Sequence, residues 1–479
     1  MNFPSFAIQL EALLFLFMAL SALHALLNKR DSRAALMWVV GCFLFSGVGA
    51  LLYWLLGVNR VRTRAREFRS RGYWRQEREN RRHREQHILP RRHRARRALA
   101  ALIPMSERVT RRPLMIGNRI RILRNGEDAY PQMIDSIRNA KTFVFLATYL
   151  FDDDGIGREF VEALRAARDR GVTVRVLVDG LGGAQAVGGI GRRLKKAKLP
   201  FAWFLPIRPL PSGLHLNLRN HRKILVVDGR VGFTGGMNIG DRHLVDLPPT
   251  ADRVQDLHFR FEGPILDEFQ EVFIEDWHFA TGEIMDLDPY PVGRLPGRAV
   301  CRALADGPNE DFEKLTWILL GVLSWARKSV RIMTPYFVPT RELVAALNTA
   351  ALRGVRVEII LPSRNNHRAV DWASRACLWE MLQKGVKFYE QPSPFNHSKL
   401  LVADGLYTLV GSANMDNRSL RLNFEFNVEV YEPGFAGRLD SHFASVKRRS
   451  RILTLAEMDG QPLWIRVRNR LAKLFSPFL

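Results

Sequence analysis

Residues 220–238, NHRKILVVDGRVGFTGGMN, and residues 396–414, NHSKLLVADGLYTLVGSAN, are two near copies of one pattern. In each copy a lysine follows the histidine by two residues, an aspartate by seven and an asparagine by seventeen. One His-x-Lys-x4-Asp pattern arises by chance in roughly a few per cent of chains this long, but two with matching tails do not. The repeat therefore predicts two homologous halves that each contribute one histidine to a shared active site.

A second pair of segments extends the repeat toward the N-terminal side of each copy. Residues 141–149 (KTFVFLATY) align with 328–336 (KSVRIMTPY), and 158–172 (REFVEALRAARDRGV) align without a gap with 341–355 (RELVAALNTAALRGV). Each set has the pattern of a strand, an amphipathic helix and a β-branched strand, which is the order of a βαβ unit. We expect an α/β fold of two βαβ repeats, over residues 113–295 and 296–479, related by a pseudo-twofold axis.

The first 59 residues are mostly apolar and predict a membrane anchor. Residues 6–27 are apolar apart from Gln9, Glu11, Ser21 and His24, and residues 36–58 carry no charge. Each stretch has the roughly 20 residues that a helix needs to cross a bilayer, and the short connector between them favours a two-helix transmembrane hairpin. A cleaved signal peptide is the alternative, but no basic residue precedes Phe6 and a second apolar stretch follows.

The formal charge of +24 is concentrated after this hairpin, in the juxtamembrane segment 60–112. Residues 60–97 hold 16 Arg against 4 Glu. We expect this run to lie against anionic lipid headgroups and to keep the rest of the chain in the cytoplasm by the positive-inside rule. Contact with nucleic acid is the alternative, although no specific nucleic-acid partner is predicted. Three cysteines without metal-ligand spacing argue against a disulfide framework or a zinc site.

The C-terminal residues 463–475 have the pattern of an amphipathic helix. Three basic residues, Arg466, Arg470 and Lys473, fall outside its apolar face. This pattern suits a helix that lies in a membrane interface, and it equally suits a terminal helix docked on the protein. The apolar face comprises Leu463, Trp464, Val467, Leu471, Leu474 and Phe475.

The doubled pattern carries the groups needed for phosphodiester chemistry. On a strand, a histidine and the lysine two residues later share one face. One neutral imidazole can attack phosphorus to form a phosphohistidine, while the other, protonated, donates to the leaving alkoxide. Lysines and asparagines can hold the phosphoryl oxygens, so neither a metal nor another cofactor is expected. The candidate residues are His221, Lys223, Asn238, His397, Lys399 and Asn414.

Asp228 and Asp404 complete the pattern, and we include them in the catalytic set. Each stands at an odd offset from its histidine and directly before a glycine. That position favours the turn that ends the strand, where an aspartate fixes the backbone instead of touching substrate.

These residues resemble the signature of the phospholipase D superfamily, H-x-K-x4-D followed by G-[GS]-x-N, over roughly residues 113–450. With the apolar N-terminus and the segments 235–241 (GGMNIGD) and 411–416 (GSANMD), the chain is similar to bacterial cardiolipin synthases. The resemblance implies an inner-membrane phosphatidyltransferase that condenses two phosphatidylglycerol molecules into cardiolipin and glycerol. Its implied partners are these membrane phospholipids, and the oligomeric state is not predicted.

The resemblance also implies roles for individual residues. His221 would be the nucleophile and His397 the acid/base, and an acidic residue would orient each histidine. The best matches for these acids are Asp256, 35 residues past His221, and Glu425, 28 residues past His397. The segments 241–243 (DRH) and 254–256 (VQD) depart from the usual Asp-Glu-Tyr and Trp-Arg-Asp of the family. A membrane-bound phospholipase D or other phosphodiesterase that uses water as acceptor is the alternative, and an inactive membrane scaffold is a more remote one.

Overall fold

The structure is a computed structural model, and it describes residues 3–29, 32–57, 88, 99–185, 189–206, 218–248, 253–291, 293–307 and 313–476. The predicted Arg-rich run over residues 60–97 lies almost entirely outside these described residues. The juxtamembrane segment is described mainly at its end, where α7 (Leu102–Thr110) packs on the second half of the molecule.

The N-terminal region contains one helix of membrane-spanning length among the described residues. In α1 (Phe3–Asn28), residues Ile8–Asn28 are long and apolar enough to cross a bilayer. The second apolar stretch was predicted to form another span, but it is divided into α2 (Ser32–Leu44), α3 (Val48–Leu52) and the π-helical turn η1 (Tyr53–Gly57). The break falls at Ser46 and Gly47, which both have positive φ, and α2 and α3 fold back along α1. The structure therefore supports one span and not the full two-span hairpin.

The first half of the catalytic region follows α7 and alternates strands with helices. Its elements are β1 (Met115–Arg124), α8 (Asn125–Arg138), β2 (Phe143–Thr148), α9 (Gly155–Asp169), β3 (Thr173–Asp179), α10 (Gly180–Gln185), α11 (Ile190–Lys196), β4 (Phe201–Phe204), β5 (Ile224–Val227), β6 (Val231–Gly235), η2 (Asp241–His243), β7 (Val254–Gln255), β8 (Leu257–Glu262) and α12 (Leu266–Thr281).

The second half repeats this order and adds elements at its end. They are β9 (Ala299–Asp306), α13 (Lys314–Trp325), β10 (Ser329–Met333), β11 (Phe337–Val338), α14 (Arg341–Leu352), β12 (Arg356–Pro362), α15 (Arg368–Gln383), β13 (Lys387–Gln391), β14 (Phe395–Asn396), β15 (Leu400–Ala403), β16 (Tyr407–Gly411), β17 (Met415–Asp416), α16 (Asn417–Arg421), β18 (Glu425–Tyr431), α17 (Pro433–Arg448), β19 (Arg451–Ile452), α18 (Leu455–Asp459) and α19 (Leu463–Leu474).

The strands show the internal repeat directly. Their order is β19-β13-β12-β10-β15-β16-β18-β9-β1-β8-β6-β5-β2-β3-β4, which reads the same way outward from the β9–β1 boundary, apart from the extra β19. In each half three neighbouring strands are parallel: β2, β3 and β4 in the first, and β10, β12 and β13 in the second. The first of the three, β2 or β10, pairs antiparallel with the hairpin that follows the His-x-Lys segment. The two repeats therefore do not form two separate sheets: β1 and β9 pair antiparallel and join them into one.

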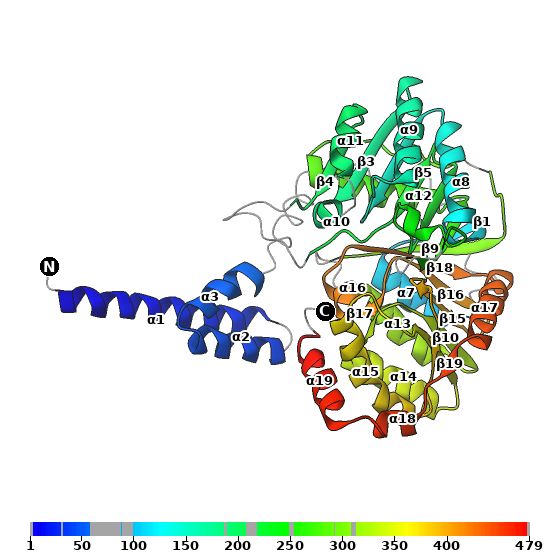
Figure 1. The fold of residues 1–479 in the computed structure, drawn as a ribbon. Helices are drawn as coiled ribbons and strands as arrows, with labels where there is room; N and C mark the ends of the chain where they lie inside the picture. The colour runs from blue at the N-terminus through cyan, green and yellow to red at the C-terminus, as the bar shows by residue number, and fades with distance from the viewer. Residues whose placement is uncertain are drawn as a thin grey trace.

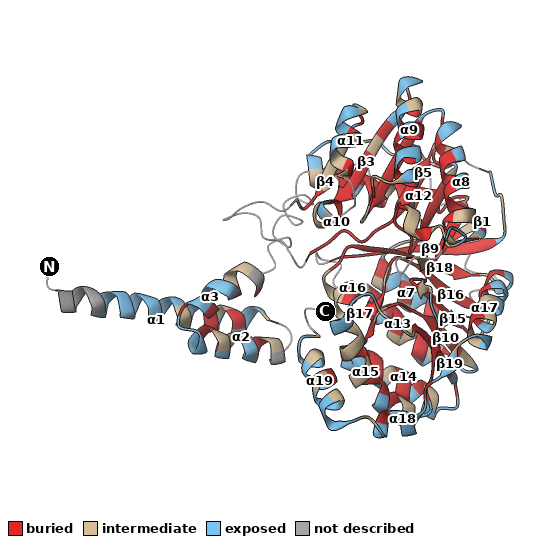
Figure 2. Ribbon diagram, in the orientation of Figure 1, coloured by how far each residue is buried: buried red, intermediate tan, exposed pale blue. Residues whose placement is uncertain are grey.

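The two catalytic halves are layered, with three buried apolar clusters between the layers (Figures 1 and 2). Helices α8 and α9 cover the outer face of the first half, and α13, α14 and α15 cover that of the second. Between the halves, α12 and α17 share one apolar cluster with strands of both. The ring of Phe269 in α12 lies 4.8 Å from that of Phe426 in β18, measured between ring centroids. The two halves thus share a core, and strands of both His-x-Lys hairpins contribute side chains to it.

Candidate active site

The shared spacing of the doubled pattern builds a β-hairpin in each half. β5 and β6 are joined by residues 228–230, which begin with Asp228-Gly229, and β15 and β16 by residues 404–406, which begin with Asp404-Gly405. Asp228, Gly229, Asp404 and Gly405 have φ between 51° and 64°. A turn with positive φ at both central positions favours Asp-Gly. The aspartates therefore stand in the turn, at the far end of the strand from the histidines, as predicted.

Both turn aspartates also accept hydrogen bonds from the backbone at the start of a neighbouring strand. The carboxylate of Asp228 accepts hydrogen bonds of 2.8–2.9 Å from the N–H groups of residues 141, 142 and 143, where β2 begins. Asp404 accepts three of 2.8 Å from residues 327, 328 and 329, where β10 begins. Burial raises the pKa of Asp228, but the three N–H groups outweigh burial and lower it. These contacts describe a structural role and no contact with the reacting groups.

Backbone pairing crosses between the halves just before each histidine. His221 N–H donates to the carbonyl of Phe424 at 2.9 Å, directly before Glu425. His397 N–H donates to the carbonyl of Gln255 at 2.7 Å, directly before Asp256. The short strands β14 and β7 pair in parallel at the second of these crossings. Each histidine is thus held beside the acidic residue of the other half.

The histidine–carboxylate pairs follow this crossing. Nδ1 of His221 lies 3.0 Å from Oε2 of Glu425, and Nδ1 of His397 lies 2.9 Å from Oδ2 of Asp256. The sequence matched each acid to its histidine by counting residues within one half, and the structure exchanges the partners. An Nδ1–H donated to a carboxylate leaves Nε2 as the free nitrogen of each ring. The four residues that form the two pairs are all buried.

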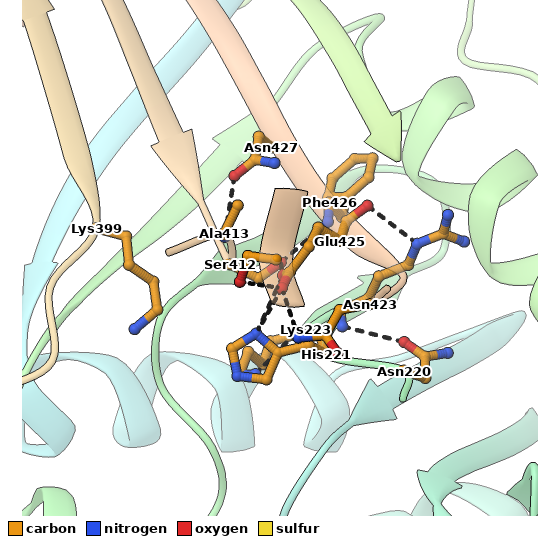
Figure 3. Close-up of polar contacts among 12 residues, drawn as sticks. Asn220, His221, Lys223, Lys399, Ser412, Ala413, Asn423, Glu425, Phe426 and Asn427 are labelled. Atoms are coloured by element: carbon orange, nitrogen blue, oxygen red, sulfur yellow. Dashed lines mark hydrogen bonds and ion pairs between the residues drawn. The ribbon is translucent and has the colours of Figure 1, made fainter. Parts of the chain in front are cut away.

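Glu425 lies at the centre of a hydrogen-bond network (Figure 3). Besides His221, its carboxylate accepts from Ser412 Oγ, Ser419 Oγ and Asn423 Nδ2. Burial raises the pKa of Glu425, but His221, Lys223 and Ser412 outweigh burial and lower it. Asp256 accepts from His397 and from the N–H of Leu257, and its burial raises its pKa. The two histidines therefore have carboxylate partners of unequal basicity.

The difference between Gly-Gly and Gly-Ser in the two motifs has a steric reason. Ser412 fills the space beside Glu425, and its counterpart in the first half is Gly236. A Cβ on Gly236 would lie 2.4 Å from Oδ1 of Asp256, well inside the distance of van der Waals contact. The glycine is therefore required where the carboxylate approaches the backbone, and the serine is tolerated where it does not.

The His-x-Lys segments were expected to lie within strands, but they directly precede β5 and β15. Each lysine nevertheless bonds back to the histidine two residues before it. Nζ of Lys223 donates to the carbonyl of His221 at 2.8 Å, and Nζ of Lys399 to that of His397 at 2.5 Å. Burial lowers the pKa of Lys223 to about 7 and that of Lys399 to about 8. Burial, the two lysines and His221 hold the pKa of His397 well below its usual range. A negative charge bound at the site would stabilise the protonated forms of Lys223, Lys399 and His397.

The two asparagines of the pattern lie close behind the hairpins. Oδ1 of Asn238 accepts from the N–H of Leu150 at 3.2 Å, which leaves its amide N–H groups as donors. Asn414 is buried, and its Oδ1 has no hydrogen-bond partner among the described residues. Among the described residues, the Oδ1 atom of Asn414 therefore keeps hydrogen-bonding capacity that no protein group uses.

Several residues at the site were missed by the sequence reasoning. Tyr149 and Tyr336 are the last residues of the aligned segments 141–149 and 328–336, and each ring packs edge to face against a histidine. The ring centroids of Tyr149 and His221 are 5.5 Å apart, and those of Tyr336 and His397 are 6.0 Å apart. Their signal was present in the sequence, because both copies end in tyrosine. Asn220 and Asn396 precede the histidines, and each accepts from the N–H two residues later, which fixes the bend before the strand.

His243 and His258 flank the Asp256 side of the site. Burial lowers the pKa of His243 to about 3 and that of His258 to about 4, so both rings are neutral near pH 7. Neither ring nitrogen of His243 has a hydrogen-bond partner among the described residues, and the same holds for Nδ1 of His258. The two rings fill space next to Asp256, which suits a structural role.

Two matching hairpins, each with a His-x-Lys pair and joined across a pseudo-twofold axis, define a phospholipase D-like fold. The solved structure of phosphatidylserine synthase from Haemophilus influenzae Rd KW20 has the same fold, with a TM-score of 0.62 at 16% identity over 79% of this chain and 100% of that one.

Comparisons of sequence identify the family within this class. A family model described as cardiolipin synthase, PLD-like domain, matches residues 133–277 and 319–447, and one described as phospholipase D-nuclease N-terminal matches residues 14–57. The chain is 31% identical to the major cardiolipin synthase of Bacillus subtilis over 98% of this chain and 99% of that one. It is 32% identical to cardiolipin synthase A of Pseudomonas aeruginosa over 96% and 93% of the two chains. The chain belongs to the cardiolipin synthase family, as its motifs predicted.

Proposed function

We propose that this enzyme joins two phosphatidylglycerol molecules into cardiolipin and releases glycerol, by way of a phosphohistidine intermediate. The observation that carries the proposal is the pair of His–Lys sets, one from each half, held at one buried site by carboxylates of the opposite half. Family membership supports phosphatidyl transfer as the reaction, because the matching relatives are cardiolipin synthases.

In the first step, His221 attacks the phosphorus of the donor lipid. Its Nδ1–H donates to Glu425, so Nε2 carries the lone pair that forms the P–N bond. The bond between phosphorus and the glycerol oxygen breaks, and protonated His397 gives that oxygen a proton. Lys223, Lys399 and the two asparagines hold the non-bridging oxygens while negative charge builds on them.

Proton uptake by His397 is coupled to substrate binding in this mechanism. In the free enzyme its pKa is well below the usual range, because the ring is buried beside two lysines. A bound phosphodiester brings a negative charge next to the same groups and favours the imidazolium. His397 therefore becomes an acid when a lipid phosphate occupies the site.

In the second step, the acceptor lipid takes the place of glycerol. Neutral His397 removes the proton from its primary hydroxyl, the alkoxide attacks the phosphohistidine, and the P–N bond to His221 breaks. One phosphodiester is exchanged for another of similar energy, so no nucleotide is consumed. Asp256 orients His397 through both steps, and Asp228 and Asp404 act only by fixing the hairpins.

We also propose that the protein is anchored in the bacterial cytoplasmic membrane with both catalytic halves on the cytoplasmic side. Support comes from α1, which is long and apolar enough to cross a bilayer, and from the match of residues 14–57 to the N-terminal family model. The Arg-rich sequence after residue 59 favours a cytoplasmic location for the catalytic halves. Membrane phospholipids are the partners that this location supplies.

A product analysis tests the reaction. The purified full chain is mixed with vesicles of phosphatidylglycerol labelled in the terminal glycerol. We expect cardiolipin and free labelled glycerol in equal amounts. Phosphatidic acid without cardiolipin would assign the chain to the hydrolytic alternative, in which water replaces the second lipid.

A donor with a good leaving group tests the roles of the two histidines. In a phosphatidyl ester of p-nitrophenol the leaving group needs no proton. His397→Ala is then expected to release a burst of about one nitrophenol per enzyme, because the first step survives without an acid. His221→Ala is expected to release none. A burst from His221→Ala and none from His397→Ala would reverse the assignment.

A further inference from the structure

Helix α19 turns its apolar face away from the protein. Leu463 is 74% exposed and Leu474 is 70% exposed. A helix on the surface of a globular protein normally turns its apolar stripe toward the core. In α19 this arrangement is reversed, and the exposed apolar residues share one face at helical spacing: Leu463, Trp464, Val467, Leu471, Leu474 and Phe475.

The opposite face of α19 attaches it to α15 by contacts that do not use these residues. The guanidinium of Arg468 lies over the ring of Trp372, 4.6 Å from its centroid. Asn469 is buried, and the flanking Ile465 and Ala472 are partly buried. Figure 2 shows the helix as mostly exposed, with a few intermediate positions. The position of α19 is therefore fixed without burying its large apolar side chains.

A row of positive charge borders the apolar face. Arg466, Arg470 and Lys473 are exposed and follow one another at intervals of four and three residues, so they lie along one edge of the helix. An apolar face with a basic edge is the composition of helices that lie in the interface of an anionic bilayer. The same edge would gain nothing from an uncharged apolar protein surface.

The end of α19 is tied to the segment that holds the active site. Nδ2 of Asn417 donates to the carbonyl of Ser476 at 2.9 Å. Asp416, the preceding residue, caps α16 by accepting from the N–H of Ser419, and Ser419 Oγ donates to Glu425. Only one short helix therefore separates the end of α19 from the carboxylate that holds His221.

We infer that the outward face of α19 docks on the interfacial layer of a bilayer of anionic phospholipids and holds the active site at the surface from which its substrates come. The choice of a membrane as the occupant rests on the proposed function. In this arrangement the lipid headgroup reaches the histidines while its acyl chains remain close to the bilayer. The apolar side chains of α19 enter the headgroup region, and the basic edge contacts lipid phosphates.

Depth-dependent quenching tests the docking without any measurement of activity. The three native cysteines are buried, so a fluorophore can be attached selectively to the full chain at Leu471→Cys, or at Ser441→Cys as the control. Ser441 is exposed on α17, on the other side of the second half from α19 (Figure 1). In phosphatidylglycerol vesicles containing lipids with a nitroxide near the headgroup, we expect quenching at position 471 and none at 441. No quenching at 471, or equal quenching at both positions, would overturn the inference. A change at 471 that depends on protein density and not on the nitroxide would overturn it too, by showing that a second copy covers the face.

A substrate comparison tests whether docking serves the reaction. Val467→Glu combined with Leu471→Glu should lower the rate on bilayer phosphatidylglycerol at least about tenfold, because two carboxylates enter an anionic interface. The rate on dispersed short-chain phosphatidylglycerol should stay unchanged, since both residues are exposed and outside the catalytic set. Ser441→Glu is the matched control and should change neither rate. An equal decrease in rate on both substrates would contradict the inference. If the wild type makes no cardiolipin, the proposed function is wrong, but the quenching result still tests the docking of α19.

Discussion

Replacing Glu425 by glutamine keeps the size of the side chain and removes the charge that faces His221. The carboxylate accepts from four side chains, at 2.5 Å from Ser412, 2.8 Å from Ser419, 3.0 Å from His221 and 3.2 Å from Asn423. A glutamine keeps one acceptor oxygen and turns an N–H₂ group toward the remaining donors. At least one buried donor therefore loses its acceptor, and the contact with His221 loses its ionic character.

The size of the effect follows from these two losses. A hydrogen bond to a charged group contributes about 1.5–3 kcal/mol, and an unsatisfied buried donor costs about 1–3 kcal/mol. Together they amount to about 4 kcal/mol. If the loss falls on the transition state, kcat should decrease about a thousandfold, since each 1.4 kcal/mol corresponds to roughly a factor of ten. The assay is the formation of cardiolipin from labelled phosphatidylglycerol by the full chain.

A double-mutant cycle separates the crossed pairing from pairing within one half. Thermal unfolding is measured for Glu425→Gln, for His221→Ala, for His397→Ala and for the two doubles that contain Glu425→Gln. We expect a coupling of about 2 kcal/mol between Glu425 and His221, and none within error between Glu425 and His397. Coupling to His397 instead, or a decrease in kcat below tenfold for Glu425→Gln, would refute the reasoning.

Three further changes probe other parts of the site. Asp228→Ala and Asp404→Ala each remove a carboxylate that accepts three backbone N–H groups, so each should lower the stability by about 2–3 kcal/mol, seen in the midpoint of unfolding, while the folded fraction retains near-normal kcat. A loss of kcat without loss of stability would make them catalytic. Gly236→Ser places a Cβ against the carboxylate of Asp256 and should reduce activity at least about tenfold; wild-type activity in this variant would show that the contact relaxes freely. Burial lowers the pKa of Lys223 to about 7, so the lysine loses its proton, and KM for the anionic lipid should rise, as pH increases above 7. Lys223→Arg stays protonated at every pH used and should remove part of this rise, and an unchanged profile would exclude Lys223 as its source.

Much of the site could be predicted because the motif is local. The histidine, lysine and turn aspartate of each copy lie within eight residues, and the preference of Asp-Gly for a hairpin turn places the aspartate at the end of the strand. The histidine and lysine were expected on the strand itself, but they lie just before it. The doubling then predicted two halves with one site. These inferences needed no knowledge of how the halves pack.

The partners of the histidines could not be assigned in the same way. The spacing from His397 to Glu425 and from His221 to Asp256 suggested pairs within each half, because chain distance was the only measure at hand. The actual partners depend on the pairing of residues 395–396 with 254–255, which results from the packing of one half on the other. Two-residue strands leave no periodic signal in the sequence.

The second apolar stretch does not form one continuous helix of membrane-spanning length, for a reason that the sequence does contain. It has no charge, and hydropathy alone therefore favoured one long helix. The small residues Ser46, Gly47 and Gly49 allow the chain to turn and to pack closely, and a Cβ on Gly49 would lie 1.9 Å from the carbonyl oxygen of Gly41. Backbone freedom outweighed apolar length at this point.

The crossed pairs also bear on how the chain acquires activity during its synthesis. When the first half leaves the ribosome, His221 and Lys223 are complete, but the carboxylate that orients His221 is still 204 residues away along the chain. A nascent first half therefore carries an unpaired histidine and cannot hold it for attack. The pair of His221 and Glu425 needs β18, and the pair of His397 and Asp256 needs residues of both halves. A chain truncated before β18 would therefore lack the carboxylate partner of the proposed nucleophile, and we expect it to be inactive.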